Sequence, residues 1–127
     1  MRYNCRMKIF VAHSSNFDFK NKLYVPLRGS ELNSQHEILL PQEGAIEEIT
    51  REMINGCDVL VAEVSAPSLG AGIEIGWADA AGVPVIAMYE KDLRPSFSID
   101  NAVTDRFEYE NSSDMLTQLA ASLSKFQ

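Results

Sequence analysis

One glutamate in this chain stands in a setting that suits covalent chemistry. Glu74 lies in a stretch expected to be helical, and Gly70, Gly72 and Gly76 lie around it. Each glycine costs a helix about 1 kcal/mol relative to alanine, so three of them indicate that a ligand or another backbone approaches there. The N-terminus of the helix would keep a nearby carboxylate ionised and could hold a phosphate. Glu74 is therefore a candidate nucleophile for glycosyl transfer.

The same residues admit two other interpretations. Gly-x-Gly followed by a further glycine can be a dinucleotide fingerprint, and Glu90 lies about twenty residues on, as that motif requires. The third gap is one residue too long, however, and the motif follows the third expected strand rather than the first. Glu74 could also be a solvated helix residue, and spacing alone does not decide among the three.

The elements that must position Glu74 follow from short apolar runs that alternate with amphipathic segments of helix length. This alternation is typical of βαβ units and of a parallel sheet covered on both faces. We expect strands at Lys8–Ala12, Glu37–Leu40, Asp58–Glu63, Val83–Tyr89 and Phe107–Tyr109. We expect helices at about Phe17–Leu32, Ala45–Asn55, Leu69–Ala81 and Asp114–Lys125, the last capped by Asn111 or Ser112. The fold class is α/β, a flavodoxin-like (Rossmann-like) three-layer sandwich with a five-stranded parallel sheet.

Right-handed crossovers give such a chain the strand order 2-1-3-4-5, and ligands then bind beyond the carboxyl ends of strands one and three. That rule selects the loops Ala12–Phe17 and Val64–Gly72. The connection Glu90–Arg106 is long for its type, so we expect it to act as a lid or to reach a partner subunit.

Length and charge limit the classes of protein to consider. The 127 residues suffice for a single domain, residues 1–127. A net charge of −7 and the lack of a basic run argue against polymeric nucleic acid as a partner. Cys5 and Cys57 fit neither a disulfide framework nor a zinc site. We find no segment near the roughly 20 apolar residues of a membrane span, and we expect a cytoplasmic protein.

The stretch Asp58–Ala78 resembles the core motif of the nucleoside 2-deoxyribosyltransferase superfamily, and most closely its 2′-deoxynucleoside 5′-phosphate N-hydrolase branch. It reads as a strand ending in Ala-Glu-Val, then Pro-Ser-Leu-Gly, a further glycine and Glu-Ile-Gly, where the family has Glu-Leu-Gly. The resemblance continues through Gly82-Val-Pro-Val-Ile-Ala-Met, and Lys8-Ile-Phe-Val-Ala-His-Ser is similar to the family's first strand and loop.

The resemblance implies roles for individual residues. Glu74 stands where the family's glutamate attacks the anomeric carbon. Ser68 and Ser14 stand where serines bind the 5′-phosphate, and Ser98 falls where a neighbouring subunit's serine would reach it. A serine rather than an aspartate at position 68 favours a nucleotide over a nucleoside. The resemblance thus implies a homodimer or a larger homo-oligomer that needs no metal or other cofactor.

Two substrate-binding positions depart from the family pattern. Phe10 replaces a tyrosine that lies close to the sugar 2′ carbon, so we expect ribonucleotides to be tolerated. Asn16 replaces a phosphate-binding arginine, and Arg94, Lys91 or His13 could supply the missing positive charge.

The third departure concerns the acid that assists the leaving base. The family has an aspartate eight residues before the Asp58 position, and this chain has Thr50, which cannot donate a proton in that role. General acid catalysis contributes about 10²- to 10⁴-fold. Glu47, one helical turn earlier, is our candidate substitute, ahead of Glu48 and Glu52.

The leading hypothesis is an N-glycosidase that cleaves the base–sugar bond of a nucleoside 5′-monophosphate through a covalent Glu74 intermediate. The alternatives are a nucleoside 2-deoxyribosyltransferase and a nucleotide-binding module without catalysis, which Thr50 and Asn16 favour. A more remote resemblance links Val11-Ala-His-Ser-Ser to TIR domains, some of which cleave NAD at a similar bond.

Overall fold

The computed structural model describes residues 5–44, 48–95 and 97–127, and its centre is one parallel sheet. The five strands are β1 (Lys8–His13), β2 (Glu37–Leu39), β3 (Val59–Glu63), β4 (Val85–Glu90) and β5 (Asp105–Tyr109). Their order is β2-β1-β3-β4-β5, and every neighbouring pair is parallel. The predicted fold class and strand order are confirmed.

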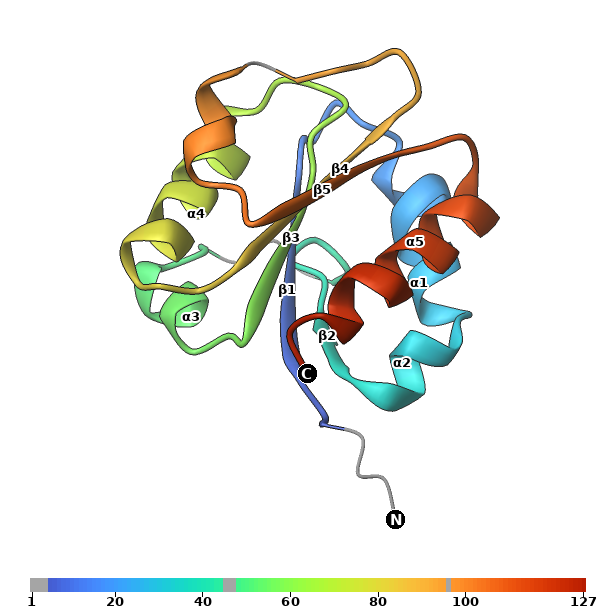
Figure 1. Cartoon of the computed structure of the whole chain (residues 1–127), viewed down its shortest axis with the longest axis horizontal. Coiled ribbons are helices and arrows are strands. Elements are labelled where there is room, and N and C mark those ends of the chain that lie inside the picture. The colour runs from blue at the N-terminus through green and yellow to red at the C-terminus, as the bar shows by residue number, and fades with distance from the viewer. Residues whose placement is uncertain (1–4, 45–47, 96) are drawn as a thin grey trace.

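Helices cover both faces of the sheet (Figure 1). On one face lie the π-helical turn η1 (Lys20–Tyr24), α1 (Val25–Arg28), α2 (Glu31–Gln35) and α5 (Ser112–Ser124). On the other lie α3 (Arg51–Asn55) and α4 (Leu69–Ala80), and the 3₁₀ helix η2 (Phe97–Asn101) precedes β5. The polypeptide is therefore a three-layer sandwich.

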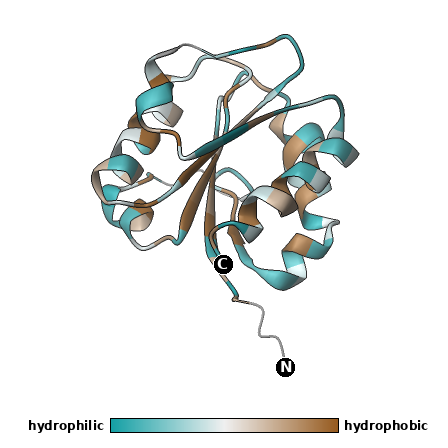
Figure 2. Ribbon diagram, in the orientation of Figure 1, coloured by the Kyte–Doolittle hydropathy of each residue, from teal (hydrophilic) through white to brown (hydrophobic). Residues whose placement is uncertain are grey.

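Successive side chains along each strand point to opposite faces of the sheet and so contribute to the two halves of the core. Ile9 and Val11 pack under η1, α1 and α5, whereas Phe10 and Ala12 pack under α3 and α4. Apolar residues consequently concentrate in the strands and on the inner sides of the helices (Figure 2). No helix in the three described ranges is long and apolar enough to cross a membrane.

The helix expected at Phe17–Leu32 is instead three short pieces. A five-residue π turn leads directly into α1, whose C-cap is Gly29, and Ser30 is the extended N-cap of α2. Gly29 and Ser30 favour a helix end and a helix start. Among the described residues 48–55, helix is present only over Arg51–Asn55, because Thr50 caps it. The cap predicted for α5 is Asn111, whose side chain accepts a hydrogen bond from the N–H of Asp114 at 2.8 Å.

Candidate active site

A cavity of about 200 Å³ lies beyond the carboxyl ends of β1 and β3, beside the start of α4. This is where the topology predicts a ligand. The sequence segments that meet there are far apart along the chain. Its lining residues are His13, Ser15, Pro41, Gln42, Ile49, Ser68, Gly70, Ala71 and Glu74.

Helix α4 places Ser68 and Glu74 at this cavity. Ser68 is the extended N-cap, and its Oγ accepts a hydrogen bond from the N–H of Ala71 at 3.1 Å. Buried Ala71 and Ile75 fix the helix on the sheet. Gly70 and Glu74 are four residues apart, so both lie on the helix side that faces the cavity.

Burial raises the pKa of Glu74 to about 7. We expected the helix N-terminus to keep this carboxylate ionised, and that expectation was wrong. Glu74 lies six residues after the N-cap Ser68, beyond the first turn, where the helix dipole acts most strongly. Loss of water contact then decides the pKa, because none of the described residues donates a hydrogen bond to this carboxylate.

The glycines of α4 leave open space that no part of the described chain fills. A Cβ at Gly72 or Gly76 would have no heavy atom within 4 Å, and one at Gly70 would have only Ser68 Oγ, at 3.9 Å. Packing within the subunit therefore does not explain these three glycines. These positions leave room for a ligand or a second subunit to approach the helix.

A chain of hydrogen bonds joins the other two loops of the cavity. His13 Nε2 lies 2.7 Å from the hydroxyl of Tyr24, which accepts a hydrogen bond from the N–H of Gln42 at 3.0 Å. His13 Nδ1 lies 3.1 Å from the carbonyl oxygen of Ser14, which can only accept, so the proton is on Nδ1. The Gln42 side chain donates to Ser15 Oγ at 3.2 Å.

None of the three residues suggested as a replacement cation supplies one to this cavity within the subunit. Burial lowers the pKa of His13, so this histidine is neutral at pH 7. Lys91 pairs with Glu110, with 3.6 Å between nitrogen and oxygen. Arg94 pairs with Asp100 at 3.4 Å and lines a different cavity, of about 500 Å³.

The remaining predicted substrate residues lie around the cavity at varying distances from it. Ser14 is buried, and its Oγ accepts a hydrogen bond from the N–H of exposed Asn16 at 3.0 Å; neither lines the cavity, whereas Ser15 does. Gly72 lines the 500 Å³ cavity on the other side of Ser68. Ser98 is exposed on η2.

Phe10 lines a neighbouring cavity of about 340 Å³ rather than the Glu74 cavity itself. Its ring is buried in the core beneath α3 and α4. The two cavities share Pro41 and Ile49 in their linings, so they adjoin one another.

The residue at the position of the family's acid caps a helix in this chain. Thr50 is the N-cap of α3, and its Oγ1 accepts a hydrogen bond from the N–H of Met53 at 3.3 Å. The candidate acid Glu47 lies outside the described residues. Glu48 and Glu52 are exposed, and neither lines the Glu74 cavity.

Residues 6–116 match the family model of nucleoside 2-deoxyribosyltransferase. The chain belongs to this family. The resemblance inferred from Asp58–Ala78 is thereby confirmed.

One relative and two solved structures are similar to this chain. A protein of Syntrophotalea carbinolica with the provisional name 2′-deoxynucleoside 5′-phosphate N-hydrolase 1 is 44% identical over 50 residues, which are 39% of this chain and 35% of that protein. The match thus spans about a third of the relative's length. The CMP N-glycosidase BcmB of Clostridium botulinum has a similar structure, with a TM-score of 0.66, 21% identity and coverage of 89% of this chain and 98% of BcmB. A conserved protein of Enterococcus faecalis V583 gives a TM-score of 0.69 at 19% identity, covering 93% and 99%.

Proposed function

We propose that this protein is an N-glycosidase that cleaves the base–sugar bond of a nucleoside 5′-monophosphate. The observation that carries the proposal is the position of Glu74, the only carboxylate among the described residues that line the cavity. Two relatives have names that specify nucleotide N-glycoside cleavage, which supports a nucleotide substrate.

The proposed chemistry has two steps. The Glu74 carboxylate attacks C1′ of the sugar, and the C1′–N bond breaks with its electron pair going to the base, which takes up a proton. Water then attacks C1′ of the glycosyl ester, gives up a proton and releases the sugar 5-phosphate with Glu74 regenerated. Glu47 remains our candidate for the proton donor to the base.

The phosphate would lie at the start of α4. Ser68 carries a hydroxyl there, and the first N–H groups of a twelve-residue helix attract an anion. The absence of a side chain at Gly70 lets the substrate approach the helix backbone. Ser14 and Asn16 from the β1 loop and Ser98 from a neighbouring subunit would complete the phosphate site.

Phe10 would set the tolerance for the sugar. A phenyl ring has no hydroxyl to crowd a 2′-OH, so we propose that ribonucleotides are accepted, as the name of BcmB indicates for that protein. Phe10→Tyr should shift the ratio of kcat/KM toward deoxyribonucleotides. An unchanged ratio would remove Phe10 from the sugar site.

We further propose a homodimer or larger assembly. Leu69 and Ile73 lie one turn apart on α4 with 84% and 45% of their surfaces exposed, next to the glycines that leave open space. Leu69→Glu should yield monomers in light scattering and lower activity. Val25→Glu is the matched control, because Val25 is 66% exposed on the opposite face of the sheet.

A cytoplasmic location is proposed on chemical grounds. Nucleoside monophosphates are metabolites of the cell interior, and Cys5 and Cys57 are free thiols. Cell fractionation with an antibody to the native chain tests this.

The decisive experiment is a mass-spectrometric screen for free base. Wild-type protein is incubated with ribo- and deoxyribonucleoside monophosphates, with and without a second base as acceptor. Hydrolysis yields base and sugar 5-phosphate in equal amounts. Formation of a new nucleoside or nucleotide only when the acceptor is present would select the transferase.

A binding module without catalysis is the second candidate, and Thr50 is the observation that favours it. The Thr50 hydroxyl caps α3, and Glu74 is the only carboxylate among the described residues that line the cavity. Those residues therefore include no second acid that could protonate the leaving base. Tight nucleotide binding with no base released from any member of the panel would select this function.

A further inference from the structure

A second glutamate, Glu63, ends β3 and is 1% exposed. Its side chain faces the half of the core under α1 and α5, as that of Val61 does two residues earlier, and it does not line the Glu74 cavity. The proposed mechanism makes no use of this buried carboxylate. An explanation has to come from its neighbours.

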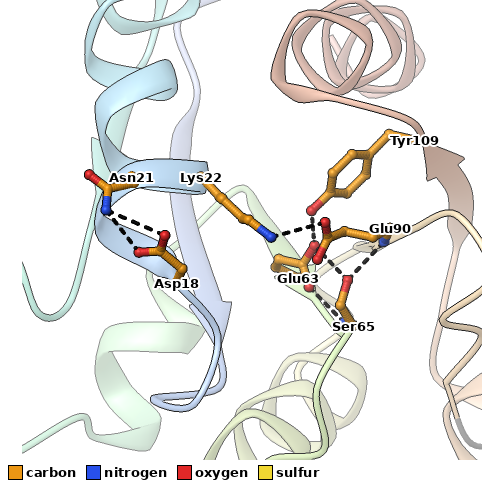
Figure 3. A network of polar contacts seen from close by, with 7 residues as sticks. All are labelled: Asp18, Asn21, Lys22, Glu63, Ser65, Glu90 and Tyr109. Atoms are coloured by element: carbon orange, nitrogen blue, oxygen red, sulfur yellow. Dashed lines mark hydrogen bonds and ion pairs between the residues drawn. The ribbon is translucent and has the colours of Figure 1, made fainter.

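Glu63 accepts three hydrogen bonds (Figure 3). The N–H of Ser65 donates to Oε1 at 2.6 Å, and the Ser65 hydroxyl donates to Oε2 at 3.0 Å. The hydroxyl of Tyr109, from β5, donates to the same Oε2. The Ser65 Oγ in turn accepts a hydrogen bond from the N–H of Glu90, at the end of β4, at 2.8 Å.

These bonds fix the start of the loop that leads to α4. Val64 donates its N–H to the carbonyl oxygen of Met88 at 2.8 Å, and Ser65 is held through both its backbone and its hydroxyl. Ser68 follows only three residues later. Three donor groups converge on the one carboxyl group of Glu63, which therefore anchors the start of the loop.

Outside this loop, the network reaches the connection after β1. The Glu90 carboxylate pairs with Lys22 of η1, with 3.3 Å between nitrogen and oxygen. Lys22 is half exposed, so this pair contributes little by itself. The strong links are therefore those between Glu63, Ser65 and Tyr109.

An apolar side chain could fill the position of Glu63 and hold the end of β3 as well or better. It could not accept hydrogen bonds from the N–H and the hydroxyl of Ser65. We infer that Glu63 is a positioning residue that sets the β3–α4 loop, and through it Ser68, for the substrate phosphate. This inference rests on the proposed function.

The loop and Glu74 are held by different contacts, which makes the inference testable. Buried Ile75 and Ala78 hold Glu74 through the body of α4, whereas Ser68 lies at the junction of loop and helix, where its Oγ accepts a hydrogen bond from the N–H of Ala71. Disturbing the anchor should therefore weaken phosphate recognition more than the chemical step.

The experiment compares four variants on CMP and on cytidine, and on the best nucleotide of the screen if that is not CMP. Glutamine has one acceptor oxygen, so Glu63→Gln cannot accept both bonds from Ser65, and Ser65→Ala removes the hydroxyl. Both should raise KM for the nucleotide roughly tenfold and leave kcat and cytidine cleavage within about threefold. Tyr109→Phe leaves the Ser65 bonds in place and should change KM less than about threefold.

Ser122→Ala is the matched control for lost stability. Ser122 is buried and donates a hydrogen bond to Asp105 at 2.6 Å, between α5 and β5, away from the loop. It should leave KM unchanged. Equal losses on CMP and cytidine, a fall in kcat at constant KM, or the same effect in Tyr109→Phe and Glu63→Gln would overturn the positioning role.

A binding measurement separates this inference from the proposed function. Calorimetry with ribose 5-phosphate needs no turnover, and the Kd should rise roughly tenfold in Glu63→Gln and Ser65→Ala but not in Ser122→Ala. If wild-type protein releases no base but this pattern of Kd holds, the function fails and the positioning role stands. If base is released and every Kd is equal, the positioning role fails alone.

Discussion

Glu63 and Glu74 stand eleven positions apart on consecutive elements, and burial raises the pKa of both. Glu63 is surrounded by donors: it accepts three hydrogen bonds and cannot contact a substrate in the cavity. Glu74 lacks any donor among the described residues, yet it faces the cavity.

The difference in hydrogen bonding indicates different roles for the two glutamates. Partial burial of a carboxylate without a hydrogen-bond partner destabilises the protein, and such groups persist mainly where function needs them. The satisfied glutamate supports the loop, and the unsatisfied one is available to react. Five predictions can break or sharpen this comparison.

The largest expected effect is on turnover. Glu74→Gln should lower kcat at least about 10³-fold, because the amide cannot form the glycosyl ester. A 2′-fluoro nucleotide should leave a sugar phosphate on Glu74 of the wild type, seen by peptide mass. Glu31→Gln, an exposed change on α2, is the control. Near wild-type turnover in Glu74→Gln would exclude the covalent mechanism.

The next effect is a dependence on pH. Attack requires the carboxylate, and the pKa of Glu74 is about 7. The acid limb of the activity profile should therefore have its midpoint near pH 7 and fall toward tenfold per unit below it. The substrate phosphate also titrates, near pH 6, so the Glu74 carboxyl should be followed directly by ¹³C NMR. A midpoint near 4.5 would show that Glu74 is well solvated.

Stability should change in opposite directions at the two glutamates. At pH 8, Glu63→Ala leaves the Ser65 and Tyr109 donors unpaired and should lower the free energy of unfolding by about 2–4 kcal/mol. Glu74→Ala removes a desolvated charge and should raise it by about 1 kcal/mol, allowing for solvent screening. Thermal melts of both variants measure this.

The gain in Glu74→Ala should itself depend on pH. The folded pKa of Glu74 lies above its value of 4.5 in the unfolded chain, so the folded state binds the extra proton between these values. Wild-type stability from this group is thus present below pH 4.5 and lost as pH rises through 7. An equal gain in Glu74→Ala at pH 4.5 and pH 8 would contradict this assignment.

The smallest effect concerns two glycines of α4. Gly70→Ala and Gly76→Ala should each stabilise the helix by about 0.5–1 kcal/mol, since a Cβ meets no close protein atom at either place. Only Gly70 lines the cavity. Activity should therefore fall in Gly70→Ala and persist in Gly76→Ala, and equal activities would remove Gly70 from the site.

Much of this architecture follows from local sequence. All five strands and α4 could be predicted because apolar runs and helix caps act within a few residues. Ser68, Gly70 and Glu74 were found at the cavity because one motif carries all three. Gln42 was missed, since it lies in no motif and only the tertiary fold brings its loop to α4. The loop Ala12–Phe17 was predicted to bind a ligand, but Ser14 was named there and the neighbouring Ser15 lines the cavity.

The ionisation of Glu74 was misjudged for a different reason. The position of Glu74 on the helix follows from the sequence. The cavity beside it is also lined by Pro41, Gln42 and Ile49, which belong to segments much earlier in the chain. Desolvation depends on these distant segments, so a sequence pattern cannot supply its magnitude.

The π-helical turn Lys20–Tyr24 has a consequence for chain length. Its closing bond runs from the N–H of Val25 to the carbonyl oxygen of Lys20, so the turn holds one residue more than an α-helical turn would. Deleting exposed Asn21 would permit ordinary α-helical bonds but would rotate the β1 loop against α1 by about 100°. Tyr24 could not then keep both its place in the core and its bond to His13. The hydrogen bonds that link the β1 loop to Gln42 through Tyr24 thus depend on the one extra residue of this turn. Deleting a residue there would break the link, whereas substituting an exposed side chain would not.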